Sequence, residues 1–213
     1  MRVALAAVVL GLAGLLAGTA HAGDARPVTA SDRALLARPA TYEETIAEQV
    51  AKRLTHIDAS VRCGSLDGAP SYVLGITPYR NGKAFGYFLM RPAECTYLAW
   101  FHEQPARWDP DSCVSTDCGY VSKIAMALAV VSHESYHLLG YSNEAQVECY
   151  GMQSIWFVAN KLGASVAESQ SLASFYATRM YPARQFNTPT YWSAQCRDGG
   201  KYDLRPQLEG WPD

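Results

Sequence analysis

At the centre of the chain stands the run Val131-Ser132-His133-Glu134-Ser135-Tyr136-His137-Leu138-Leu139-Gly140. Residues four apart on a helix lie one above the other, so a helix through this run sets His133 and His137 on one face with Glu134 beside them. Two imidazoles at this spacing are typical of a zinc site, and an adjacent carboxylate can take a proton from water. The run therefore predicts a Zn²⁺ site with His133 and His137 as ligands, Glu134 as catalytic general base, and peptide hydrolysis as the reaction.

The residues before this run predict that its helix is buried. From Tyr120 to Val131 they are almost wholly apolar and rich in alanine, as in a helix covered on nearly every side. Burying an unpaired charge is costly, so Glu134 and the two histidines need a partner, and a divalent metal ion provides one. The competing interpretation is a buried polar network left by a degenerate motif.

The chain is predicted to turn back after this helix. Gly140 is typical of a helix C-cap, and Asn143 is typical of the N-cap of a second helix, over residues 144–156. The two helices would then form an antiparallel hairpin.

Two acids on the second helix are candidates for a third metal ligand. Glu144 and Glu148 are four residues apart and share a face, so in the hairpin they lie level with His137 and His133 respectively. Catalytic zinc usually takes three protein ligands, and its histidines donate their second nitrogen to a carboxylate or carbonyl. One acid should therefore bind the metal and the other should orient a histidine. The alternative for Glu144 is an exposed first-turn acid that the helix dipole favours.

This combination of HExxH and Glu144-Ala145-Gln146-Val147-Glu148 resembles the zincin metallopeptidases, and among them the gluzincin pattern of HExxH followed by Glu-x-x-x-Asp. It also looks like poorly characterised secreted bacterial HExxH proteins. The resemblance implies a small zincin-like domain with Glu144 as the third zinc ligand and Glu148 as the acid that braces the first histidine. The spacing from His137 to Glu144 is shorter than in most gluzincins, and the bracing residue is Glu instead of Asp, so the choice between the two acids stays open.

The first forty residues are predicted to be removed or irregular. Residues 1–22 combine Arg2, a short apolar run and Ala20-His21-Ala22, which is typical of a secretory signal peptide, with an uncleaved membrane anchor as the alternative. Residues 23–40 are polar, contain two prolines and show little apolar period, which predicts a flexible leader. Residues 41–213 have the length of a single domain. The mature protein is expected to be secreted or periplasmic, without stable insertion in a membrane.

Six cysteines, an even number, all follow the predicted signal peptide, which favours disulfides in an oxidising compartment. A second zinc site built from cysteines is the competing interpretation, but the chain lacks a CxxC pair. The favoured pairing is Cys63–Cys95, Cys113–Cys118 and Cys149–Cys196.

The remaining patterns predict an α+β fold with a short antiparallel or mixed sheet, packed on the active-site helix and further helices and stapled by disulfides. Thr41 and Glu44 form a capping box ahead of apolar residues at helical spacing, and other apolar or aromatic runs are bounded by turn residues. The predicted elements are a helix over residues 42–58, strands over 72–76, 84–89 and 95–101, a turn at Asn81-Gly82, and a helix over 166–180.

Hydrolysis would gain from an additional hydrogen-bond donor to the oxyanion that forms at the substrate carbonyl. Tyr181, Tyr191 and His102 are candidates, although such side chains are more often packed or surface aromatics. Asp203 is expected to be a turn residue.

Two functions are expected to compete. The first is a secreted zinc metallopeptidase that acts on a peptide or protein, or on a cell-wall amide. The second is a non-catalytic extracytoplasmic binding protein in which a structural metal site is closed by four protein ligands. The formal net charge of −2 and the lack of a Lys/Arg cluster argue against nucleic acid as a partner.

Overall fold

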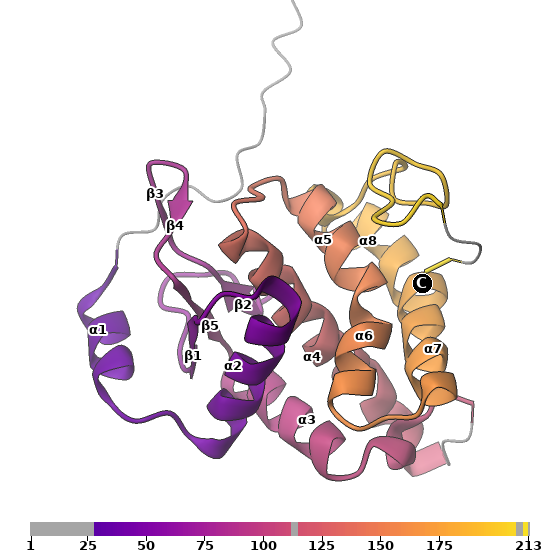
Figure 1. Cartoon of the computed structure of the whole chain (residues 1–213), viewed down its shortest axis with the longest axis horizontal. Coiled ribbons are helices and arrows are strands. Elements are labelled where there is room, and N and C mark those ends of the chain that lie inside the picture. Colours follow the sequence, from indigo (N-terminus) through magenta and orange to yellow (C-terminus); the bar gives the residue numbers. More distant parts are fainter. Residues whose placement is uncertain (1–27, 112–114, 208–210, 213) are drawn as a thin grey trace, which may run out of the picture.

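Helix α4 lies at the centre of the protein, and the other elements surround it. The computed structural model describes residues 28–111, 115–207 and 211–212, and for residues 115–118 the backbone alone. Figure 1 shows the small sheets, α1 and α2 on one side of α4, and α5 to α8 on the other. In chain order the elements are α1 (Ala30–Ala37), α2 (Tyr42–Thr55), β1 (Ser60–Cys63), β2 (Gly75–Ile76), β3 (Tyr79–Arg80), β4 (Lys83–Ala84), β5 (Tyr87–Met90), α3 (Pro92–Glu103), η1 (Pro105–Trp108), α4 (Ser115–Leu138), α5 (Glu144–Gln153), α6 (Ile155–Lys161), α7 (Val166–Phe175), the π-helix η2 (Tyr176–Met180), α8 (Tyr181–Asn187) and η3 (Pro189–Tyr191).

The burial of α4 confirms what its apolar sequence predicts. Ile124, Leu128 and Val131 have no exposed surface, and the helix packs against α2, α3, α5 and α6. A helix with apolar residues on every face is stable in water only when neighbouring elements cover it on all sides. The residues of the HExxH run therefore lie inside the protein and not on its surface.

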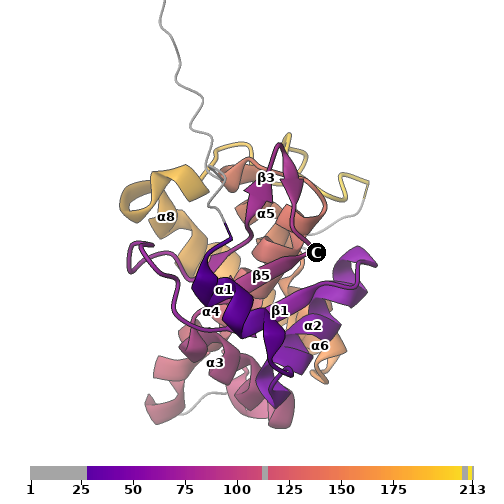
Figure 2. The ribbon, with the colours of Figure 1, turned by 90° about the vertical axis from the view of Figure 1, so that its left-hand side faces the viewer.

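The main sheet has three strands in the order β1-β5-β2, with β1 parallel and β2 antiparallel to β5. Its central strand β5 is buried on both faces. Phe88 and Met90 point into the main core, whereas Tyr87 and Leu89 join a smaller cluster that includes Leu35 of α1. Figure 2, viewed from that side, shows α1 in front of β1 and β5. The prediction of an α+β fold with a short mixed sheet is confirmed.

A separate hairpin projects from the sheet. Asn81 and Gly82 connect β3 to β4, and both have positive φ angles, 52° and 74°, as a type I′ turn requires. The predicted turn is thus confirmed, but the strands predicted on either side of it are much shorter. Of residues 72–76 only β2 is a strand, and residues 84–89 are divided between β4 and β5.

The strand predicted over residues 95–101 is wrong, because this segment belongs to helix α3. Its aromatic residues favour a strand, but Pro92 occupies the first helical turn, where its missing N–H costs nothing. Cys95, Leu98 and Ala99 are buried at helical spacing against the core. Strand β1 was not predicted.

The flexible leader predicted over residues 23–40 is wrong for residues 30–37, which form α1. Thr29 and Asp32 make a reciprocal capping box, and the Asp32 side chain, which is fully buried, also accepts a hydrogen bond from Tyr87 at 3.3 Å. Two specific polar contacts thus fix a helix that lacks a long apolar period. The predicted signal peptide, residues 1–22, lies outside the described residues.

The remaining helix predictions agree with the structure except at their ends. Helix α2 begins after Thr41 with the predicted capping box and ends at His56, which adopts the left-handed conformation. The helix predicted over residues 144–156 is divided at Ser154 into α5 and α6. The helix predicted over residues 166–180 contains a π-helical turn and continues as α8.

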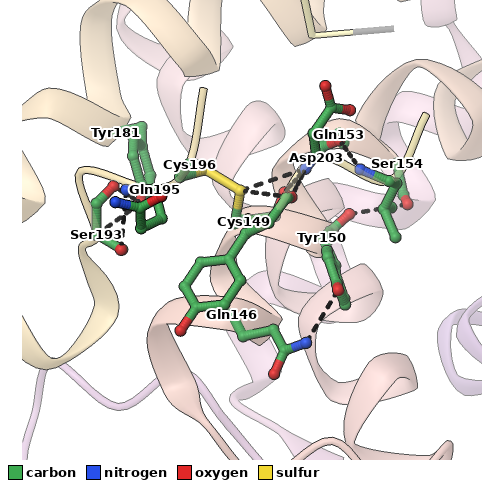
Figure 3. The surroundings of a disulfide bond; sticks show 12 residues. Gln146, Cys149, Tyr150, Gln153, Ser154, Tyr181, Ser193, Gln195, Cys196 and Asp203 are labelled. Atoms are coloured by element: carbon green, nitrogen blue, oxygen red, sulfur yellow. Dashed lines mark hydrogen bonds between the residues drawn. A yellow bond between two sulfur atoms is a disulfide. The ribbon is translucent and has the colours of Figure 1, made fainter. Parts of the chain in front are cut away.

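Two of the three predicted disulfides are present in the described residues. Cys63–Cys95 joins β1 to α3, and Cys149–Cys196 joins α5 to the C-terminal segment. Figure 3 shows the second bond with Gln153 beside it. The predicted pair Cys113–Cys118 lies outside the residues whose side chains are described. Among the described residues, none of the helices combines the length and apolar character needed to cross a membrane.

Candidate metal centre

The turn between α4 and α5 brings the predicted ligands together. Gly140 has a φ angle of 93° and donates its backbone N–H to the carbonyl of His137 at 2.9 Å, as a helix C-cap does. The Asn143 side chain then caps α5 by accepting a hydrogen bond from the N–H of Gln146 at 2.9 Å. Both predicted caps are confirmed, and they fold α5 back along α4.

Gly151 allows the two helices to approach closely. A Cβ atom at this position would lie 3.0 Å from the backbone nitrogen of His133 and 3.3 Å from the carbonyl oxygen of Ala129. A side chain at this contact would push the two helices apart by a few tenths of an ångström. Gly151 therefore sets the short distance over which acids on α5 reach histidines on α4.

Three side chains form a group that could hold a metal ion: His133, His137 and Glu144, whose nearest ligand atoms all lie within 4.8 Å of one another. The Nε2 atoms of the two histidines are 3.0 Å apart. The Glu144 carboxylate lies 2.9 Å from Nε2 of His133 and 3.5 Å from Nε2 of His137. All three side chains are almost completely buried.

The opposite nitrogen of each histidine already has a partner. Nδ1 of His137 donates to the carbonyl of Tyr141 at 2.7 Å, and Nδ1 of His133 lies 3.0 Å from the carboxylate of Glu148. Because both partners only accept hydrogen bonds, the Nδ1 atoms carry the protons. In the neutral imidazoles, the Nε2 lone pairs then point toward each other and toward Glu144.

This donor set fits a divalent cation. Two nitrogen lone pairs and a carboxylate in contact repel one another unless a positive charge lies between them. Burial alone would lower the pKa of His133, but its hydrogen bonds to Glu144 and Glu148 outweigh burial and raise that pKa to about 10. The same hydrogen bonds to histidine hold the pKa of Glu144 well below its usual value against the opposing effect of burial. The two acids thus favour a positive charge on or beside His133, which either a proton or a metal ion can supply.

Glu148 lies on the far side of His133 from this group. Its Oε2 atom faces Nδ1, while its Oε1 atom accepts a hydrogen bond from the Tyr176 hydroxyl at 2.5 Å and forms an ion pair with Arg184 at 3.1 Å. Burial would raise the pKa of Glu148, but Arg184 and His133 lower it to about 2. Of the two acids, Glu144 therefore lies among the metal-facing atoms, and Glu148 lies behind one histidine.

Glu134 is buried beside the same group and is fixed by the sheet. The Thr77 hydroxyl lies 2.7 Å from Oε2 of Glu134 and 3.2 Å from its backbone carbonyl, and acts as the donor. A Cβ atom at Gly75 would come within 2.6 Å of Oε1, so a larger residue there would displace this carboxylate. Burial raises the pKa of Glu134, although nearby histidines and Thr77 partly offset it.

A pocket of about 210 Å³ opens beside these residues. Its wall includes Tyr191, whose ring centroid lies 5.7 Å from that of His133. Of the candidate oxyanion donors, only Tyr191 lines this pocket. The Tyr181 hydroxyl instead exchanges hydrogen bonds with the backbone of Ser193, and His102 contacts the carbonyl of Leu162. Asp203 accepts hydrogen bonds from the backbone of Gly199 and Arg205, as expected of a turn residue.

Several residues of the site have no signal in the sequence. Tyr79, on β3, donates its hydroxyl to the carbonyls of His137 and Tyr141 and so fixes the turn behind His137. Thr77, Tyr176 and Arg184 lie too far along the chain from the HExxH run for any spacing rule to connect them. Only their contacts in the folded protein show their place in the site.

Comparisons with protein families, with curated proteins and with solved structures each gave no match. What the site can do is therefore inferred from its geometry and chemistry.

Proposed function

We propose that this protein is a zinc-dependent hydrolase that cleaves peptide bonds outside the cytoplasm. The observation that carries the proposal is the convergence of two imidazole Nε2 atoms and the Glu144 carboxylate in one pocket with the buried carboxylate of Glu134. The two disulfides support an oxidising compartment, which agrees with a secreted or periplasmic protein.

The number of protein donors favours catalysis over a closed structural site. Structural zinc is usually held by four protein ligands, whereas catalytic zinc has three and keeps a position open. Tyr176 and Arg184 hold Glu148 behind His133, so it does not add a fourth ligand. Two histidines and one glutamate are a common ligand set for zinc in hydrolases, where the ion polarises the substrate carbonyl and lowers the pKa of water.

Glu134 is proposed as the general base. In its ionised form it would take the proton of the attacking water and later give it to the leaving nitrogen. A carboxylate whose pKa is raised by burial holds that proton more readily than an exposed one. The hydrogen bond from Thr77 fixes one oxygen of Glu134 and leaves the other free to accept.

Tyr191 is proposed to stabilise the oxyanion. It lines the pocket next to His133, and within the described residues its hydroxyl makes no hydrogen bond. A tyrosine O–H directed at the developing negative charge would strengthen its hydrogen bond in the transition state.

The pocket wall is consistent with an apolar side chain of a substrate. Val73 and Leu74 line it from the sheet side, and Ala129 and Val130 line it from α4. An apolar group that leaves water for this wall gains about 25 cal/mol per Å² of buried surface. We therefore expect cleavage next to apolar residues.

The proposal is tested by elemental analysis of the purified protein together with cleavage of an unfolded protein and of a cell-wall peptide. The wild type is compared with Glu134→Gln, Glu144→Gln and, as a matched control, Glu103→Gln, which changes an exposed glutamate on α3. We expect about one zinc per chain in the wild type, Glu134→Gln and Glu103→Gln, but cleavage only in the wild type and Glu103→Gln. Glu144→Gln should lose zinc.

The other outcomes have distinct meanings. Zinc without cleavage of either substrate would favour a non-catalytic binding protein. Cleavage of the cell-wall peptide alone would support the proposed mechanism but assign a cell-wall amide as the substrate. Wild-type protein that binds no zinc, or a Glu134→Gln variant as active as the wild type, would contradict the proposed function.

A further inference from the structure

We propose that Tyr176 and Arg184 are positioning residues for the metal centre, and that the π-helical turn η2 brings them to the same oxygen of Glu148. This inference rests on the proposed metal site, because the group that they orient is His133. Neither residue touches the metal-facing atoms.

The two side chains act on one atom. The Tyr176 hydroxyl donates to Oε1 of Glu148 at 2.5 Å, and Nη2 of Arg184 lies 3.1 Å from the same oxygen. Arg184 also donates to the Tyr176 hydroxyl at 3.0 Å, so the three groups form a closed triangle. A carboxylate held at one oxygen by a hydrogen bond and an ion pair cannot rotate freely, and its other oxygen stays directed at Nδ1 of His133.

The helical geometry explains the role of η2. In a continuous α-helix, eight residues turn through about 80° more than two full turns, so Tyr176 and Arg184 would point in clearly different directions. A π-helix, with i→i+5 hydrogen bonds, turns less per residue and rotates Arg184 back toward the side of Tyr176. The π-helical segment Tyr176–Met180 begins at the first of the two residues that share Glu148 and ends before the second. Such turns occur often at functional sites because they realign side chains.

The burial of these side chains strengthens the contacts that orient His133. Tyr176 has no exposed surface, and the Glu148 and Arg184 side chains are 5% and 15% exposed. Without competition from water, the hydrogen bonds hold the His133 ring in the orientation and the tautomer in which Nε2 faces the pocket. In metal sites, partners of this kind affect metal affinity although they do not bind the ion.

Arg184 also connects this triangle to the pocket. Its guanidinium group also lies over the ring of Tyr191, with Cζ 5.5 Å from the ring centroid. A single side chain thus contacts the acid behind His133 and the tyrosine on the pocket wall. The same residue positions a metal ligand and the proposed oxyanion donor.

The test uses the full-length mature protein and two readouts. The variant Tyr176→Phe removes one hydroxyl and keeps the ring, and Arg184→Gln removes the cation. Arg179→Gln is the matched control, because Arg179 belongs to the same π-helical turn but is exposed. Zinc affinity is measured by competition with a chelator, and the Nδ1–H resonance of His133 is followed by NMR in metal-free protein labelled at histidine.

We expect the zinc affinity of Tyr176→Phe to fall about tenfold, which is the smaller end of the range of about 10–100-fold seen when a residue that orients a metal ligand is lost. The affinity of Arg184→Gln should fall further. The His133 resonance should shift or broaden in both variants, and neither readout should change in Arg179→Gln. If Tyr176→Phe keeps the wild-type affinity and resonance, the inference is overturned, even if Arg184→Gln fails to fold. If the wild type binds no zinc but Tyr176→Phe still alters the His133 resonance, the proposed function fails and the positioning role stands.

Discussion

Replacing Gly151 with alanine should force α5 away from α4. The new Cβ atom would lie 3.0 Å from the nitrogen and 3.2 Å from the Cα atom of His133, whereas ordinary contacts begin at 3.4 Å. These are backbone atoms of a buried helix and cannot rotate away. Helix α5 must therefore retreat by a few tenths of an ångström, and it takes Glu144 and Glu148 with it.

The size of the effect follows from two opposing contributions. Overpacking a helix contact costs about 1–3 kcal/mol, while alanine in place of glycine within a helix gains about 1 kcal/mol. Gly119 on α4 provides the control, because a Cβ atom there meets nothing within 4 Å. Gly119→Ala should raise the free energy of unfolding, and Gly151→Ala should lie about 1–3 kcal/mol below that control.

Urea unfolding of the metal-free proteins measures this difference, and chelator competition measures the accompanying loss of zinc affinity, expected to be about tenfold. If Gly151→Ala stabilises the protein as much as Gly119→Ala and binds zinc as tightly as the wild type, the close contact between the two helices does not control the site.

Three other changes test further parts of the structure. Gly75→Ala should displace Glu134, whose Oε1 atom would be 2.6 Å from the new Cβ, and lower the cleavage rate about 100-fold while zinc stays bound; an unchanged rate would show that Gly75 does not control the position of Glu134. Replacing Cys149 and Cys196 together by alanine opens a loop with a sequence separation of 47 and should lower the free energy of unfolding by about 4 kcal/mol; a loss below about 1 kcal/mol would show that other contacts hold the C-terminal segment. The pKa of His133 is raised to about 10 in the folded protein from its ordinary 6.5, so in metal-free protein with chelator its protonation stabilises the folded state fully below pH 6.5. Urea unfolding at a series of pH values should show this contribution fall as the pH rises toward 10, and a free energy of unfolding that does not change over this range would contradict the prediction.

The hairpin that carries the candidate ligands could be predicted because its signals are local. The HExxH spacing, the C-cap at Gly140 and the N-cap at Asn143 are each set by a few adjacent residues, and the structure contains both caps. The four side chains His133, Glu134, His137 and Glu144 accordingly lie together as expected, although their chemical roles stay predictions.

Elements that depend on distant contacts could not be predicted. Helix α3 contains several aromatic residues that favour a strand when considered alone, and its packing against α2 and α4 decides the helical form. The residues that hold the site's side chains in place also depend on contacts between distant parts of the chain. Thr77 lies 57 residues before Glu134, and Tyr176 lies 28 residues after Glu148, so no local pattern links them.

The residues that orient the candidate metal ligands are synthesised after the ligands themselves, and this order affects how the metal centre forms. All three side chains that could hold the metal precede residue 145, but Tyr176, Arg184 and Cys196 follow much later in the chain. A partly synthesised chain therefore holds the histidines without the groups that orient them. The complete centre can form only after nearly the whole chain has emerged, and early metal binding would occur in an unsupported, weaker site.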